Sequence, residues 1–273
     1  MTKITIEIED PARAEELIAV ISQLSYVKEI RISDNQAELN SDLSLSSIGV
    51  KKAAYQEVSD IWDIAAQFPP DKKWTFDDLQ SYFPKDLKIK LEIIHGELFI
   101  QEYSFYENYI LYQQHQLPDM PRPSKLHQRI SRKLSYQMSD FAETHDLGEI
   151  FYAPFDVKLD EEHVSQPDIL LVAKVHSERL KDTYLEGAPD LVVEILSPAN
   201  YKSERDKKHE LYESFGVSEY WLIYPQKRKI TVEVLREGKF QLFSEAEQNG
   251  TIKSFLLEGF EITLEEILGK DEN

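Results

Sequence analysis

Apolar residues recur along the chain with the periods of both strands and helices. Alternation with period two predicts strands at residues 3–9, 27–32 and 229–236. Apolar runs predict buried strands at 166–173 and 190–198 and a further strand at 219–225. A stripe with helical spacing predicts a helix over 125–144, and a second helix is predicted over 203–215.

Turn and capping residues indicate where these elements begin and end. His95 and Gly96 are typical of the turn of a hairpin, here over 88–102. Gly216 follows the helix predicted at 203–215 in the position of a C-terminal cap. Strands that pair as hairpins early and late, with helices between them, predict an α/β fold with a mixed central sheet flanked by helices.

The first 70 residues differ from the rest of the chain. They begin with a β-α-β pattern over 1–40, which is too short to bury much core alone. A helix predicted at 52–66 is then stopped by Pro69-Pro70. We therefore predict an accessory module at 1–70, used for docking or for forming a homodimer, and a second domain at 71–273.

Composition indicates the cellular compartment of the protein but does not identify its chemistry. With 273 residues, 41% of them hydrophobic, the chain can bury a sizeable core. It lacks the run of about 18 apolar residues that a membrane helix needs, and its alternating start is unlike a signal peptide. Cysteine is absent, which excludes disulfides and thiolate metal sites. These features favour a cytoplasmic protein with no membrane partner.

The formal net charge of −19 argues against unspecific binding of nucleic acid. The charge is unevenly spread, because residues 121–230 hold 16 Lys+Arg against 19 Asp+Glu, a net of −3. Five cations and no acid lie within 121–133: Arg122, Lys125, Arg129, Arg132 and Lys133. They form either a solvated helix face or an edge that faces phosphate groups, so charge alone leaves the substrate open.

Two carboxylates stand beside apolar strands. Asp168 follows Pro167 at the start of one strand, and Glu194 is the sole polar residue within the run LVVEIL. A buried carboxylate is costly unless it is paired or bound to a cation. Glu194 alone is also compatible with a structural ion pair or a half-solvated strand end, and Asp168 alone with a turn.

The combination of the two acids with a helix that carries Lys207 and Lys208 favours phosphate chemistry. Two carboxylates plus water are ligands that Mg²⁺ prefers, because it is a hard cation that retains several waters. A nearby ammonium group can polarise the attacking water and offset the charge of the phosphate.

At this point the sequence resembles the Uma2 family of endonuclease-like proteins, once a domain of unknown function, within the PD-(D/E)XK nuclease superfamily. The resemblance covers about residues 74–268 and leaves 1–70 outside. The matching stretches are PRPSKLHQRI (121–130), QPDILLV (166–172), GAPDLVVEILSPAN (187–200) and RDKKHELYESFGVSEYWLIYP (205–225). The resemblance implies a restriction-endonuclease-like core that uses Mg²⁺ or Mn²⁺.

The resemblance also implies roles for individual residues. Asp168 and Glu194 correspond to the two acidic positions, and the backbone carbonyl of Ile195 would be a further metal ligand. The superfamily's lysine, expected two residues after Glu194, is replaced by Leu196; in this family it is moved to the next helix, which implies Lys208.

Other positions stay open at this stage. Lys207 is a weaker candidate for the lysine, since helix geometry alone does not exclude it. Tyr212 is an accessory candidate, and Glu204 is assigned no role. His127 either contacts substrate or second-shell water, or satisfies a local bond at the start of its helix.

Two further pairs of residues are predicted to have structural roles. Glu92 and Glu97 flank the predicted hairpin turn and are interpreted as solvated turn acids. Tyr220 and Trp221 are predicted to lie in the core.

These observations favour a metal-dependent phosphodiesterase that hydrolyses DNA, an endonuclease, with Asp168, Glu194 and Lys208 as its catalytic set. A binding or regulatory protein that retains the nuclease fold without turnover is the alternative, since the acidic balance and the moved lysine are compatible with it. Hydrolysis of RNA or of another phosphate ester is a third hypothesis. Convergence of the carboxylates and Lys208 at one site would favour the enzyme.

Overall fold

The computed structural model describes residues 61–84, 87, 89–101, 103–114, 123–196 and 202–269, with the backbone alone at 202–205. The β-α-β unit predicted over 1–40, most of the helix predicted at 52–66, and the greater part of the proposed homodimer module lie outside these residues. The division after residue 70 stays a prediction. From Ile64 onward the chain forms one compact unit.

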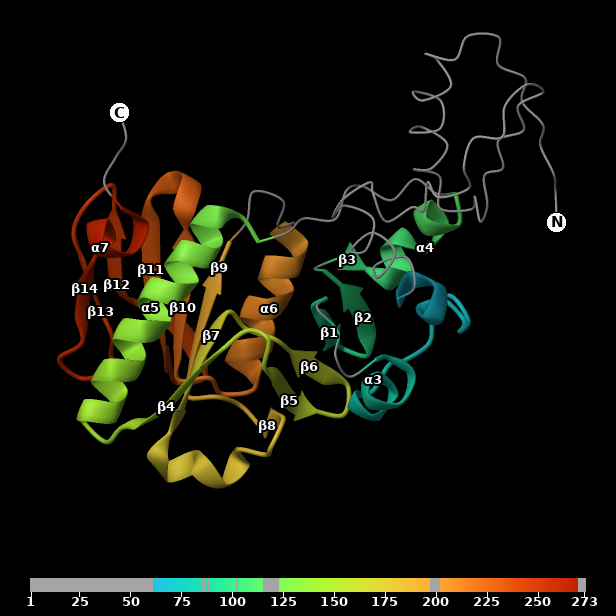
Figure 1. The fold of residues 1–273 in the computed structure, drawn as a ribbon, viewed down its shortest axis with the longest axis horizontal. Helices are drawn as coiled ribbons and strands as arrows, with labels where there is room; N and C mark the ends of the chain where they lie inside the picture. The colour runs from blue at the N-terminus through green and yellow to red at the C-terminus, as the bar shows by residue number, and fades with distance from the viewer. Residues whose placement is uncertain are drawn as a thin grey trace, which may run out of the picture. The chain divides into compact units, whose positions relative to one another are not determined.

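Two six-stranded mixed sheets organise this unit (Figure 1). The sheet that we call the β9 sheet has the order β12-β11-β10-β9-β7-β4, and the β1 sheet has the order β3-β2-β1-β6-β5-β8. The strands of the β9 sheet are β4 (Gly148–Tyr152), β7 (Ile169–Ala173), β9 (Leu191–Ile195), β10 (Glu219–Tyr224), β11 (Lys229–Arg236) and β12 (Lys239–Glu247). Those of the β1 sheet are β1 (Leu91–Ile94), β2 (Glu97–Ile100), β3 (Tyr103–Ser104), β5 (Asp156–Asp160), β6 (His163–Ser165) and β8 (Tyr184–Glu186).

The remaining elements are helices and a small ribbon. The helices are α3 (Phe76–Tyr82), α4 (Phe105–Gln113), α5 (Lys125–Thr144), α6 (Lys202–Ser214) and α7 (Leu264–Leu268), with 3-10 turns at Lys174–Arg179 and Pro225–Lys227. The ribbon pairs β13 (Thr251–Lys253) with β14 (Glu261–Thr263). None of the helices in the described part of the chain is long and apolar enough to cross a membrane.

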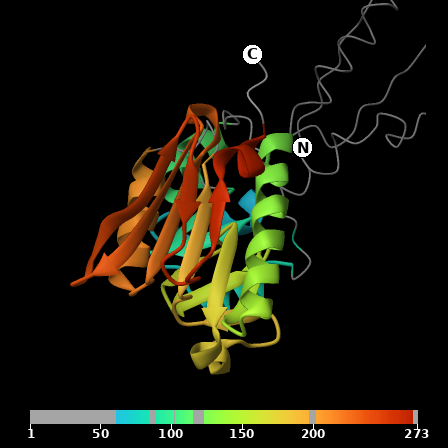
Figure 2. The ribbon, with the colours of Figure 1, turned by 90° about the vertical axis from the view of Figure 1, so that its left-hand side faces the viewer.

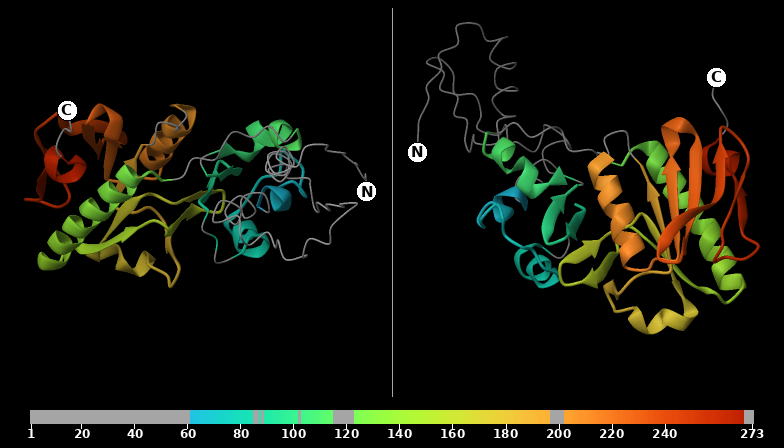
Figure 3. Two further views of the ribbon diagram at one scale, coloured as in Figure 1. Left: turned by 45° about the horizontal axis from the view of Figure 1, so that its top comes forward. Right: turned by 180° about the vertical axis from the view of Figure 1, so that it is seen from behind.

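Helices cover both faces of the β9 sheet (Figures 2 and 3). On one face α5 and α7 pack against alternate strand residues, with Ile130 and Leu134 of α5 beside Val193 and Trp221. On the other face Tyr212 of α6 packs against residues of the opposite parity, such as Val192 and Tyr220. The helix predicted over 125–144 is confirmed, and its apolar stripe is the face that it buries.

The predicted single central sheet is only part of the architecture. Two consecutive strands lie in different sheets, because β4 belongs to the β9 sheet and β5 belongs to the β1 sheet. β6, which the sequence pattern did not predict, then pairs with both β5 and β1. The β1 hairpin therefore belongs to a second sheet.

The turn predicted at His95-Gly96 is confirmed and joins β1 to β2. Both residues have positive φ, +55° and +73°, as a two-residue type I′ turn requires. A Cβ atom at Gly96 would also lie 2.8 Å from Cδ of Lys73. Glycine therefore suits this position for both conformation and space.

A buried carboxylate ties the end of the chain to the β9 sheet. Glu219, at the start of β10, is fully buried. Its oxygens accept hydrogen bonds from the Trp221 indole, from Ser254 Oγ (2.8 Å), and from the backbone N–H groups of Phe255 (2.8 Å) and Leu256 (2.6 Å). The side chain thus fixes the loop between β13 and β14.

Replacing this carboxylate is expected to destabilise the fold. Glu219→Ala leaves four donors without their acceptor, and those of Trp221 and Ser254 are buried, so the free energy of unfolding should fall by about 3 kcal/mol or more. Glu149→Ala, at an exposed position on β4, is the matched control and should change it by no more than about 0.5 kcal/mol. Urea unfolding measures both; equal stability of the two variants would contradict the assigned role of Glu219.

Candidate active site

Strand pairing brings the two predicted acids together. β7 and β9 are antiparallel neighbours, with Ile169 opposite Val193. Asp168, immediately before β7, accepts a hydrogen bond at Oδ2 from the backbone N–H of Ile195, at 2.7 Å. Glu194 lies within β9 between two residues that pack beneath α5, so its side chain points to the face covered by α6. Both acids are buried, with 9% and 5% of their surface exposed.

Helix α6 supplies the groups that contact Glu194. Tyr212 Oη donates a hydrogen bond to Glu194 Oε1 at 2.8 Å, and Lys208 Nζ lies 3.3 Å from the same oxygen. Lys208 is 8% exposed, an unusual degree of burial for a lysine. Lys207 points elsewhere, with Nζ 3.3 Å from Glu97 Oε2 and 5.0 Å from the centroid of the Phe99 ring. Lys208 is therefore the α6 lysine at the acidic pair.

Strand β1 adds a third carboxylate, and the residue before this strand adds a second lysine. Glu92 is 1% exposed, and its Oε1 lies 2.9 Å from Lys208 Nζ and 3.6 Å from Lys90 Nζ. The same oxygen accepts a hydrogen bond from the backbone N–H of Gln166 at 2.9 Å. Lys208 is thus shared between Glu92 and Glu194, and we call these five groups, Lys90, Glu92, Asp168, Glu194 and Lys208, the acidic cluster.

His127, in the first turn of α5, reaches the acidic cluster from another direction. Its Nε2 lies 3.2 Å from Asp168 Oδ2. The hydroxyl of Ser124 accepts the His127 backbone N–H, so the local capping interaction uses the main chain and leaves the ring directed at Asp168. His127 Nε2 therefore contacts a carboxylate 41 residues further along the chain and not a group at the start of its own helix.

The surroundings of the three carboxylates shift their pKa values in different directions. Burial raises the pKa of Glu194, and the charges of Asp168 and Glu92 add to this effect against Lys208 and Lys90. Burial also tends to raise the pKa of Asp168, but its hydrogen bond with His127, the charge of Lys90 and the Ile195 N–H outweigh burial and lower it. For Glu92, Lys208 and Lys90 overcome burial and lower the pKa. Glu194 is therefore the acid that retains a proton most readily.

The donor set fits a hard divalent cation. Asp168 Oδ1 and Glu194 Oε2 accept no hydrogen bond from any residue described here, whereas the other oxygen of each group is occupied. No three His, Asp or Glu side chains in the described part of the chain are arranged as a metal centre. Two carboxylate oxygens suffice for Mg²⁺, which keeps several waters, and the Ile195 carbonyl stands beside them in sequence.

Several sequence-based expectations need correction or completion. Glu92 was expected to be a solvated turn acid, which is wrong, because α6 covers that face of β1 and Lys208 provides its counter-charge. Glu97 is half-buried and bonded to Ser104 and Lys207. Glu204 lies among residues whose side chains are not described. Tyr220 and Trp221 are buried, as predicted.

The basic segment 121–133 divides into two kinds of residue. Arg129 Nη2 and Lys133 Nζ bind the carbonyl oxygens of Leu268 and Glu266 at 3.4 and 2.6 Å, at the C-terminal end of α7. Lys125 and Arg132 are exposed, and Arg122 is outside the described residues. Arg129 and Lys133 therefore join α5 to α7.

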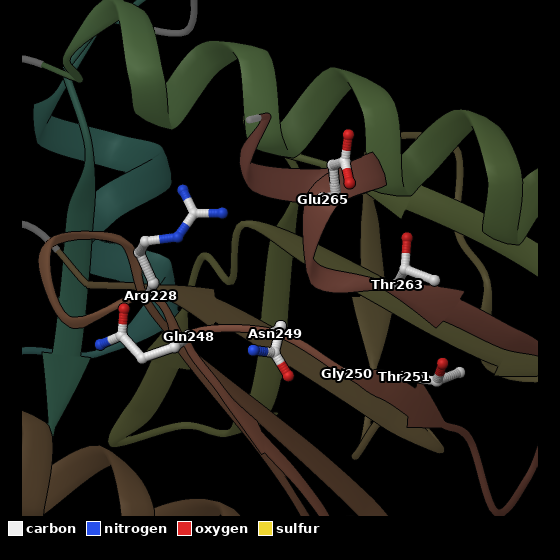
Figure 4. Close-up of a pocket in the computed structure, with 7 residues that line it drawn as sticks. All are labelled: Arg228, Gln248, Asn249, Gly250, Thr251, Thr263 and Glu265. Atoms are coloured by element: carbon white, nitrogen blue, oxygen red, sulfur yellow. The ribbon is translucent and has the colours of Figure 1, made fainter. Parts of the chain in front are cut away.

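A hollow in another part of the domain contains no comparable chemistry. It is lined by residues 248–251 together with Arg228, Thr263 and Glu265 (Figure 4). Glu265 is its single acid, and Arg228 Nη2 donates to the Gly269 carbonyl at 2.9 Å. Because paired carboxylates are missing from this lining, the acidic cluster is the stronger candidate for the active site.

Comparison with known proteins identifies the fold and the family of the chain. A putative nuclease of the DUF820 family from Anabaena variabilis has a similar fold, with a TM-score of 0.54 and 16% sequence identity over 71% of this chain and 97% of that one. Among curated proteins no match is found. Residues 101–265 match Uma2, described as "Putative restriction endonuclease", and cover more than half of the chain. The protein belongs to the Uma2 family.

Proposed function

We propose that the acidic cluster is the active site of a metal-dependent endonuclease that hydrolyses phosphodiester bonds of DNA. The observation that carries the proposal is the convergence of Asp168, Glu194 and Lys208, three residues from three elements, at one buried site. Membership of the Uma2 family supports the reaction class. The proposal goes beyond this reaction class in naming DNA as the substrate.

Asp168 Oδ1, Glu194 Oε2 and the Ile195 carbonyl would hold Mg²⁺ or Mn²⁺. A bound divalent cation would supply positive charge to the phosphate and acidify a water molecule. Tyr212 and the Ile195 N–H keep the other carboxylate oxygens occupied, so both acids have fixed orientations. His127 contacts the same Asp168 oxygen as the Ile195 N–H and so helps to hold this carboxylate.

Lys208 is the group that would act on the reacting atoms. Its ammonium group lies beside Glu194, where it can orient a water molecule for in-line attack and stabilise the charge that develops on the phosphate. Lysine donates three hydrogen bonds and accepts none, so it suits this task better than metal binding.

The first experiment is a cleavage assay. Purified protein is incubated with supercoiled plasmid, linear single-stranded DNA or RNA, with Mg²⁺ or Mn²⁺ and with a chelator. We expect the wild-type protein to nick or linearise the plasmid when metal is present. We expect no cleavage with chelator or with Asp168→Ala. Cleavage of RNA alone would replace DNA as the substrate, and metal binding without any turnover would favour the non-catalytic alternative.

Divalent metal is expected to stabilise the protein through the same acids. Ligand at a hundredfold excess over its dissociation constant adds about 2.7 kcal/mol to the native state, which corresponds to about 5 °C or more for a domain of this size. Melting curves with Mn²⁺ should show this shift for the wild type and a much smaller one for Asp168→Ala. Equal shifts in both proteins would count against the site.

The two lysines of α6 should behave differently. Lys208→Ala is expected to lose about a hundredfold or more in cleavage rate while still binding metal, since the lysine is not a ligand. Lys207→Ala should keep most of its rate, because its ammonium group pairs with Glu97. Rates at saturating metal and plasmid measure the difference; a larger loss in Lys207→Ala would move the assignment to that residue.

A further inference from the structure

The β1 hairpin carries two charged side chains that have no role in the proposed reaction. Glu92 lies on β1, and Lys90 immediately precedes this strand, with its Nζ 3.6 Å from Glu92 Oε1. Glu92 is as deeply buried as the core, at 1% exposed, and the Lys90 side chain is 15% exposed. A buried ionised pair contributes little net stability against an apolar pair of similar volume, so stability alone is a weak explanation for them.

Glu92 makes the shorter of the two carboxylate contacts to Lys208. Its Oε1 is 2.9 Å from Lys208 Nζ, against 3.3 Å for Glu194 Oε1. The Gln166 N–H binds the same Glu92 oxygen and fixes the carboxylate to the strand that leads to Asp168. The position of the Lys208 ammonium group is therefore set by β1 as much as by β9.

The charges of the acidic cluster give Glu92 a second effect. Without Glu92, the ammonium groups of Lys90 and Lys208 would match the two charges of Asp168 and Glu194 and leave no net attraction for a cation. With Glu92, three carboxylates face two lysines, a net charge of −1 when all are ionised and His127 is neutral. One divalent cation and one singly charged phosphodiester then bring the whole assembly to neutrality.

We propose that Glu92 is a positioning residue of the active site: it holds the Lys208 ammonium group beside Glu194 and offsets the charge of the two lysines, so that Asp168 and Glu194 retain their affinity for a divalent cation. The inference rests on the proposed function for the identity of the site. It assigns Glu92 a role through Lys208, which together with the Gln166 N–H occupies its Oε1, and no direct bond to the metal.

The test is the affinity for Mn²⁺ alone, measured by titration calorimetry on the full chain without DNA. Glu92→Gln keeps the shape of the side chain and an oxygen acceptor for the Gln166 N–H but removes the charge. It should weaken Mn²⁺ binding by about 10- to 100-fold, the range typical of groups behind metal ligands. Glu97→Gln is the matched control, since Glu97 lies on the same hairpin and pairs with Lys207, and its affinity should equal that of the wild type.

A second variant separates charge from misfolding. Lys90→Met makes the acidic cluster more negative, so it should bind Mn²⁺ more tightly, by about threefold or more. The change in charge should therefore shift the Mn²⁺ affinity of Glu92→Gln and of Lys90→Met in opposite directions, whereas damage to the fold would weaken Mn²⁺ binding in both variants. Weaker binding in both, unchanged binding in Glu92→Gln, or complete loss of binding as in Asp168→Ala would each overturn the inference, the last by making Glu92 a ligand.

Cleavage distinguishes this inference from the proposed function. A wild-type protein that binds Mn²⁺ without cleaving any nucleic acid contradicts the nuclease but leaves the comparison of Glu92→Gln with Lys90→Met decisive. A wild-type protein that does not bind Mn²⁺ overturns the inference directly. If cleavage is observed, Glu92→Gln at saturating Mn²⁺ should lower kcat with little change in KM, because Lys208 loses its fixed position; an unchanged kcat would overturn the positioning role.

Discussion

The burial of ionised groups at one point between the two sheets is the constraint on which the rest of the domain depends. Removing a single charge from water costs several kcal/mol, even in a relaxed protein interior. Glu92, Glu194 and Lys208 are each less than a tenth exposed, and each is tolerable only because the others are present. The β1 hairpin, β9 and α6 must therefore fold together. The charged residues that join these elements are also the candidate active-site residues.

The same constraint separates the behaviour of two neighbouring acids. Asp168 contacts an imidazole and accepts a backbone N–H at one oxygen, which lowers its pKa, whereas burial, together with the charges of Asp168 and Glu92, raises the pKa of Glu194. A divalent cation between them would favour the ionised form of both. Such a cation would offset both the desolvation of the two carboxylates and their mutual repulsion.

Local signals in the sequence predicted the elements well but not the way in which they meet. The stripe over 125–144, the His95-Gly96 turn and the cap at Gly216 each depend on residues close together in the chain, and each has the predicted structure. Asp168 and Glu194 stood out because a carboxylate beside apolar strands is conspicuous. Lys90 and Glu92 did not, because their alternation with apolar residues is also typical of a strand with one solvated face. The cover that α6 places on that face joins residues more than 100 positions apart, which no local pattern can report.

The location of the lysine follows from the same packing. Two residues after Glu194, where the wider superfamily is expected to have lysine, this chain has Leu196, which packs with Val192, Tyr212 and Tyr220 on the face covered by α6. A lysine there would need to displace this apolar contact. Lys208 enters instead from the helix above, and its ammonium group reaches the position between Glu92 and Glu194 while the strand keeps its core residue. A lysine on a helix is oriented by tertiary contacts, here with Glu92 of β1 and Glu194 of β9, so the β1 hairpin helps to fix the position of this ammonium group.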